Sequence, residues 1–174
     1  MKKFIYSIVA FLLVIPVALG LVACNNEAPK TETVDLTEAN VVGDWEVSNV
    51  TYTPGTGVTI QADSCTKAEW DVLDGTDYAE LTQAQKDKWD LFDGFFHSYR
   101  LKAEDHKMYD ITDGSETEAA SWAIDNGEIT YEESLPGYAA DSVVWNNGSI
   151  VLTVTIPAGD YAGTYVLTLA KVTA

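Results

Sequence analysis

The chain of 174 residues carries 27 acidic side chains against 10 basic ones, a formal net charge of −17 at pH 7. That length fits a single domain. Proteins bind nucleic acids and anionic membrane surfaces through clustered lysine and arginine, so this charge excludes nucleic acid as a partner and excludes electrostatic attachment to a membrane.

The N-terminal residues have the order of a secretory signal peptide. Two lysines precede an apolar run over residues 4–19, and Leu21-Val22-Ala23-Cys24 follows. A charged start, an apolar centre and a small-residue cleavage site predict export. A retained membrane anchor is the alternative, because about 20 apolar residues suffice to cross a bilayer. Pro16 and Gly20 interrupt the run, however, and no basic flank follows it.

Leu21-Val22-Ala23-Cys24 resembles the lipobox of bacterial lipoproteins. The resemblance implies that residues 1–23 are removed and that the Cys24 thiol carries a lipid, which attaches the chain to the cell envelope. Asn25 rather than aspartate follows the cysteine, which favours the outer membrane. The sequence does not distinguish the periplasmic side of that membrane from its surface side. The outer leaflet of a Gram-positive membrane is a further alternative. Lipidation leaves Cys65 as the only thiol, so we expect no disulfide and a buried, inert cysteine.

Residues 24–40 are polar and predict a flexible tether, so the domain is expected to occupy residues 41–174. The first part of this domain predicts one long strand over residues 42–53. A Pro-Gly turn and a short strand ending at Gln61 are expected to follow.

Residues 64–94 interrupt the strand pattern with helical signals. Thr82 and Gln85 have capping-box spacing. Aromatic residues then recur at i, i+3 and i+7 from Trp89, which predicts a short amphipathic helix that ends at Asp93-Gly94. This insertion forms either a lid over one end of the fold or a surface loop.

Two Asn-Gly dipeptides, Asn126-Gly127 and Asn147-Gly148, centre predicted hairpins, because two-residue turns need positive φ at both positions. The predicted pairs are Trp122 with Tyr131, Ile124 with Ile129, Trp145 with Ile150 and Val143 with Leu152. Further strands are predicted over residues 95–102, 107–111 and 165–169.

The strand pattern predicts the fold class. About eight to nine short strands, each with one apolar face, favour an all-β, antiparallel up-and-down barrel with a short helical insertion. Closure into a barrel covers the apolar face and removes exposed edges. A two-sheet sandwich is the alternative, and periodicity does not separate the two.

Gly43-Asp44-Trp45 opens the first predicted strand and resembles the G-x-W signature of the lipocalins. The order of elements is similar to that of lipocalin-like lipoproteins of Bacteroidetes-type bacteria. The resemblance implies a barrel in which Gly43 and Trp45 lie at the closed end, beneath Lys171 from the last strand. It also implies a membrane-anchored protein that binds a small apolar or amphipathic ligand in the barrel. The alternative is a structural or accessory envelope lipoprotein whose surface loops bind a glycan or a protein.

Alternation along the strands places four candidate ligand-binding residues inside the barrel, namely His97, Tyr99, Trp122 and Tyr131. His97 and Tyr99 are the candidate polar groups. The aromatic side chains either line a cavity or fill the interior, so the sequence is compatible with a hollow barrel and with a filled one.

The sequence has no catalytic motif. Neither G-x-S-x-G nor H-E-x-x-H occurs, and the acidic run at residues 71–77 lacks the ligand spacing of an EF-hand. A single remaining cysteine excludes a thiolate zinc site. We therefore expect no enzyme activity, no cofactor and no metal site. Trp70, Trp89 and Phe92 offer an alternative binding surface, a platform on which sugar rings would stack.

Overall fold

The computed structural model describes residues 33–60, 62–133 and 140–173. The predicted signal peptide and Cys24 lie outside these ranges. The described residues belong to one compact unit, Thr33–Ala174. None of the helices in these ranges is long and apolar enough to cross a membrane.

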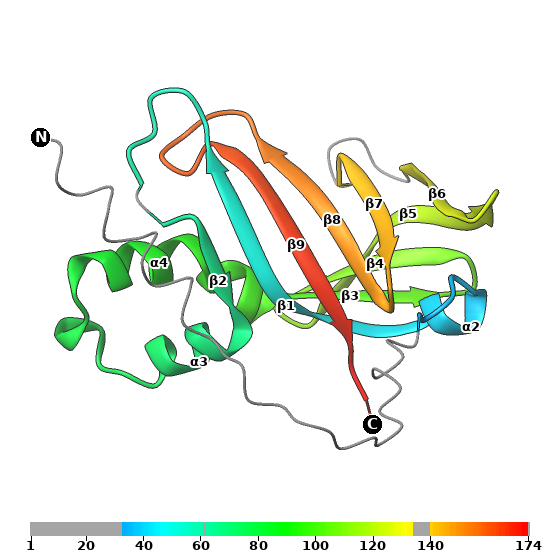
Figure 1. Ribbon diagram of the computed structural model, residues 1–174, viewed down its shortest axis with the longest axis horizontal. Helices are drawn as coiled ribbons and strands as arrows, with labels where there is room; N and C mark the ends of the chain where they lie inside the picture. The colour runs from blue at the N-terminus through cyan, green and yellow to red at the C-terminus, as the bar shows by residue number, and fades with distance from the viewer. Residues whose placement is uncertain (1–32, 61, 134–139, 174) are drawn as a thin grey trace, which may run out of the picture. The chain divides into compact units, whose positions relative to one another are not determined.

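One antiparallel sheet organises this unit (Figure 1). Its strands are β1 (Gly43–Pro54), β2 (Ser64–Thr66), β3 (Tyr99–Glu104), β4 (Lys107–Thr112), β5 (Ser115–Asp125), β6 (Glu128–Glu133), β7 (Ser142–Asn146), β8 (Ser149–Ile156) and β9 (Gly163–Lys171). Their order is β6-β5-β4-β3-β1-β9-β8-β7, and β2 pairs only with β1. The end strands β6 and β7 contact each other without a hydrogen-bonded ladder among the described residues. The fold is therefore a nearly closed up-and-down barrel of eight strands, as predicted, and not a sandwich.

Both predicted Asn-Gly hairpins are confirmed. Asn126 and Asn147 have φ values of 50° and 46°, and the glycines after them have φ values of 81° and 90°. The resulting registers pair Trp122 with Tyr131 and Trp145 with Ile150, as the two-residue turns require.

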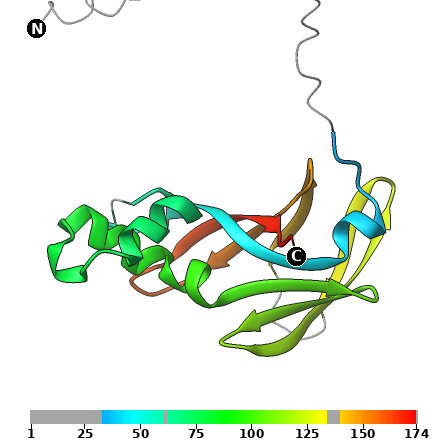
Figure 2. The ribbon, with the colours of Figure 1, turned by 90° about the horizontal axis from the view of Figure 1, so that it is seen from below.

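Short helices lie at both ends of the barrel. α2 (Glu38–Val41) lies at one end, and α3 (Lys67–Asp74), η1 (Tyr78–Glu80) and α4 (Gln83–Asp93) lie at the other (Figure 2). α4 begins with the predicted capping box, in which the Thr82 N–H and hydroxyl donate to Gln85 Oε1 at 2.9 and 2.8 Å. A second capping box, between Thr66 and Glu69, begins α3. The aromatic spacing alone did not indicate this second helix.

The short strand predicted to end at Gln61 is wrong, because residues 55–60 form no strand. The Gly55 N–H donates instead to the Ala162 carbonyl at 2.8 Å, which ties the chain after β1 to the β8–β9 connection. The extra partner of β1 comes later, from β2, where Cys65 lies opposite Val50.

The strand predicted over residues 95–102 begins only at Tyr99. Residues 94–98 continue the helical path of α4 as a π-helical turn, η2 (Gly94–Ser98). Gly94 keeps right-handed helical dihedrals, φ −58° and ψ −32°, so this glycine does not stop the helix where the sequence pattern placed its end.

The segment before β1 packs on the barrel. The Val34 N–H donates to Asn147 Oδ1 at 2.7 Å, and Trp145 Nε1 donates to the Val34 carbonyl at 3.0 Å. The predicted tether of residues 24–40 is therefore wrong for residues 33–40, which belong to the folded unit.

Aromatic side chains gather at both ends of the core. At the α2 end, Trp45 is fully buried and meets Trp145 edge to face, with ring centres 6.0 Å apart. At the other end, Tyr165 packs against Tyr52 at 4.7 Å and against Phe95 at 5.1 Å.

Candidate functional site: the interior cavity

A cavity of about 200 Å³ lies inside the barrel. Seven strands, η2 and Ala140 contribute to its wall. The lining residues are Phe95, Tyr99, Leu101, Met108, Asp110, Ala119, Ala120, Tyr131, Ala140, Val143, Leu152, Val154 and Leu167. Apart from two tyrosines and one aspartate the wall is apolar, which is the usual composition of a small-molecule pocket. The barrel is hollow at this point.

The polar groups of this interior cavity centre on Tyr99 and Asp110. The Tyr99 hydroxyl donates to Asp110 Oδ1 at 2.9 Å, across the β3–β4 pair. Burial raises the pKa of the Asp110 carboxyl, and the Tyr99 hydrogen bond opposes that rise. Burial, and then the negative charge of Asp110, raise the pKa of Tyr99 well above its ordinary value. Tyr99 therefore remains a hydrogen-bond donor at neutral pH.

Tyr131 joins the two sides of the gap between β6 and β7, which we call the seam. Its hydroxyl donates to the Ala140 carbonyl at 2.7 Å. Tyr131, Ala140 and Val143 all line the interior cavity, so the seam forms part of the cavity wall.

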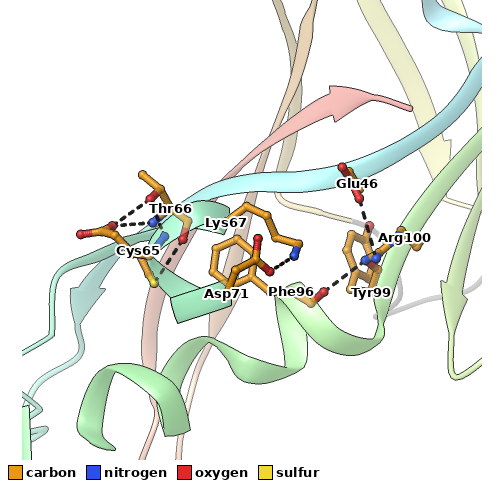
Figure 3. A network of polar contacts seen from close by, with 9 residues as sticks. Glu46, Cys65, Thr66, Lys67, Asp71, Phe96, Tyr99 and Arg100 are labelled. Carbon is orange, nitrogen blue, oxygen red and sulfur yellow. Dashed lines mark hydrogen bonds and ion pairs between the residues drawn. The ribbon is translucent and has the colours of Figure 1, made fainter. Parts of the chain in front are cut away.

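Arg100, the only arginine in the chain, holds the turn that leads into Tyr99 (Figure 3). Its guanidinium donates to the Phe96 carbonyl at 3.3 Å and to the Tyr99 carbonyl at 2.8 Å. Glu46 on β1 lies 3.8 Å from the same guanidinium. These contacts fix the change from η2 to β3, and through it the position of Tyr99 in the wall.

The G-x-W residues lie at the α2 end of the barrel. The Lys171 ammonium lies 5.8 Å from the centre of the Trp45 ring, and it donates to the Ala39 and Asn40 carbonyls at 3.1 and 3.2 Å. Trp45 Nε1 donates to the Val41 carbonyl at 2.9 Å. Gly43 sits beside the lysine, since a Cβ on this residue would lie 2.7 Å from Lys171 Cε. The three residues therefore lie together at this end, and none of them lines the interior cavity.

Of the four candidate ligand-binding residues, Tyr99 and Tyr131 line the cavity, whereas Trp122 and His97 do not. Trp122 is buried near the α2 end, where its Nε1 donates to the Lys107 carbonyl at 3.2 Å and its ring lies 5.4 Å from His106. The predicted inward position of His97 is wrong. His97 is exposed and its ring stacks on Trp70, because strand alternation does not apply within η2.

The predicted platform of Trp70, Trp89 and Phe92 is also wrong in part. Trp70 and Phe92 are buried, with 6% and 0% of their surface exposed, because α3 and α4 pack these faces against the barrel. Trp89 is partly buried and meets Tyr78 edge to face at 5.5 Å. Two tyrosines of this region are exposed, Tyr78 and Tyr161, and Tyr161 lines an open groove of about 630 Å³.

Cys65 is buried on β2, and its surroundings make it a poor nucleophile. Burial raises the pKa of the thiol to about 11, which leaves almost no thiolate at neutral pH. Within the described ranges, His, Cys, Asp and Glu form no group of three or more that is arranged to hold a metal ion.

Asp110 is the site residue that the sequence interpretation missed. The predicted strand over residues 107–111 contained the signal, because alternation puts Asp110 on the same face as Met108, which is buried. An acidic residue at an inward position of an apolar strand face is rare unless it is paired or functional.

Comparison of the chain with protein-family models, with curated proteins and with solved structures finds no match. The fold and the cavity therefore carry the functional argument.

Proposed function

We propose that this chain is a lipid-anchored envelope lipoprotein, similar in kind to lipocalin-like lipoproteins, that binds a small apolar or amphipathic ligand in the interior cavity. The observation that carries the proposal is the cavity of about 200 Å³ with a mostly apolar wall. A cavity of about 150 Å³ with such a wall is enough to bind benzene. Burial of the ligand's apolar surface supplies the binding free energy.

The anchor belongs to the same proposal. Lipidation at Cys24 would hold the barrel at the outer membrane, and residues 25–32 would separate it from the lipid. We propose binding rather than catalysis, because the cavity wall offers one carboxyl and two hydroxyl groups but no histidine, lysine or cysteine.

Filling the cavity tests the proposal. Ala120 on β5 is 4% exposed and lines the cavity, so Ala120→Leu places additional carbon atoms inside it. Ala123, on the same strand, is exposed, and Ala123→Leu is the matched control. Toluene and benzyl alcohol are titrated into each protein, and binding is followed by amide chemical shifts.

We expect the unmodified protein and Ala123→Leu to bind both compounds and Ala120→Leu to bind neither. The two leucine variants must keep the circular dichroism of the unmodified protein, since overpacking costs about 1–3 kcal/mol. If no aromatic probe of this size, neutral or charged, shifts the amides of the cavity residues in the unmodified protein, the cavity proposal is refuted.

Glycan binding through surface loops is the second candidate, and the groove beside Tyr161 favours it. The groove lies between residues 56–60, α4 and residues 157–162. Tyr161 is 45% exposed, which leaves a ring face for a sugar, and Asp87 and Asp90 supply hydrogen-bond acceptors. Loss of glycan-array signals in Tyr161→Ala, with toluene binding unchanged, would support this candidate. An unmodified protein that binds no glycan on the array would refute it.

A further inference from the structure

Among its side chains the interior cavity offers a ligand one charged acceptor and no unused donor. Both tyrosine hydroxyl hydrogens are engaged, that of Tyr99 by Asp110 and that of Tyr131 by the Ala140 carbonyl. No lysine, arginine or histidine is among the lining residues. A ligand carboxylate would therefore be repelled by the Asp110 carboxylate and would find no free donor to stabilise it.

Asp110 has capacity for another hydrogen bond. A carboxylate has two oxygens and accepts about four hydrogen bonds. Among the described residues, Tyr99 is the only hydrogen-bond partner of Asp110, and it binds Oδ1. No ion pair to Asp110 occurs in the same ranges. Asp110 is partly buried, which weakens its hydration, and a donor on a ligand would offset part of that cost.

The cations on β3 and β4 are engaged elsewhere, and Arg100 is held by Glu46 and two backbone carbonyls. Lys102 on β3 pairs with Glu104 and Glu116 at 2.9 and 3.4 Å. Lys107 on β4 pairs with Glu118 at 2.6 Å. Neither lysine lines the cavity, so the charge of Asp110 is left for whatever occupies it.

The cavity also limits the size of the ligand. Benzene, with six carbon atoms, binds in a cavity of about 150 Å³, so a cavity of about 200 Å³ holds roughly eight non-hydrogen atoms. The remainder of the wall, including Leu101, Leu152 and Leu167, is apolar and suits a hydrocarbon ring or short chain.

We propose that the interior cavity selects a small amphipathic amine, whose ammonium group donates to Asp110 while its apolar body lies against the leucine side chains. This inference rests on the proposed function and names the ligand class. A neutral alcohol satisfies the same carboxylate less well, and a carboxylic acid is disfavoured because the cavity has no donor for it.

Four probes of nearly equal size test the selection: benzylamine, benzyl alcohol, toluene and benzoate. They are titrated into the unmodified protein at pH 7, and dissociation constants are taken from amide chemical shifts or calorimetry. A charge-assisted hydrogen bond strengthens binding by about tenfold or more. We expect benzylamine to bind at least about tenfold more tightly than toluene, benzyl alcohol to lie between them, and benzoate to bind most weakly.

Two substitutions assign the effect to the carboxylate. Asp110→Asn keeps the shape but removes the charge, so benzylamine should lose its advantage over benzyl alcohol while toluene binding is unchanged. Tyr99→Phe removes the internal donor and leaves the carboxylate free, so benzylamine binding should be kept or strengthened. Asp44→Asn, at an exposed position of β1, is the matched control and should change nothing.

The outcomes separate the two proposals. If none of the four probes binds, the cavity-binding function itself is refuted. If toluene or benzoate binds as tightly as benzylamine, the function stands and the amine selection is overturned. The same holds if Asp110→Asn keeps the full preference for benzylamine. The probe series on the unmodified protein decides the matter even if a variant fails to fold.

Discussion

Replacement of Gly43 by alanine should be among the most destabilising single-methyl additions in this barrel. Gly43 has φ of +141°, a conformation that residues with a Cβ adopt only at a cost of about 1–3 kcal/mol. The new Cβ would lie 2.7 Å from Lys171 Cε, so the lysine must move. Its displacement removes the cation–π contact with Trp45, which contributes about 0.5–1 kcal/mol. The expected loss is about 2–4 kcal/mol.

Thermal unfolding followed by circular dichroism measures this loss. For a domain of this size, about 3 °C of melting temperature corresponds to 1 kcal/mol, so Gly43→Ala should lower it by roughly 6–12 °C. Two glycine controls separate the causes. Gly57 has φ of +88° with nothing within 4 Å, so Gly57→Ala reports backbone strain without a clash. Gly94 has an ordinary helical φ and open space, so Gly94→Ala should be neutral or slightly stabilising.

A double-mutant cycle isolates the contact with the lysine. In a Lys171→Ala background the Cε atom is gone, so Gly43→Ala should then cost only its backbone strain. An equal cost of Gly43→Ala in both backgrounds would show that the close approach of Lys171 does not require the glycine.

Three further predictions follow from the buried groups and from the N-terminus. Cys65 should react with a disulfide reagent at pH 7.5 at least about a hundredfold more slowly in the folded protein than in urea, because burial raises its pKa to about 11; rapid stoichiometric reaction of the folded protein would contradict this. Burial raises the pKa of Asp110, so the folded state binds the proton more tightly than the unfolded state, and stability falls as pH rises from the ordinary aspartate pKa through the raised one. Asp110→Asn should therefore gain stability relative to the unmodified protein between pH 4 and pH 7 in denaturant titrations, and a gap that is constant with pH would refute the assignment. Cys24→Ser should move the protein from the detergent-extracted membrane fraction to the soluble fraction and abolish incorporation of labelled palmitate, and membrane retention of this variant would indicate an uncleaved anchor instead.

Local signals in the sequence sufficed for the hairpins and for α4. Asn126-Gly127 and Asn147-Gly148 each determine a register through the φ values they accept, and Thr82 with Gln85 marks a helix start. Such features depend on residues that are close in the chain, so the pattern alone was enough. The barrel followed from counting strands of this kind.

Features that depend on distant contacts were predicted poorly. Alternation places His97 inside the barrel, but the helical path of α4 continues through Gly94 into η2, where Phe96 packs beside Trp70 of α3 at 5.9 Å. Residues 33–36 look like a tether until Val34 meets Asn147, which is 113 positions away. Asp110 was readable as an inward acidic residue, yet its pairing with Tyr99 required the β3–β4 register.

The seam between β6 and β7 has a dynamic consequence. Every other neighbouring pair of barrel strands shares a ladder of backbone hydrogen bonds, whereas β6 and β7 share none among the described residues, and the Tyr131 hydroxyl bridges them by donating to the Ala140 carbonyl. Parting these two strands therefore breaks far fewer hydrogen bonds than parting any other pair. Local opening of the barrel should therefore occur between β6 and β7. The amide hydrogens of these two strands should exchange with solvent before those of β1 and β9.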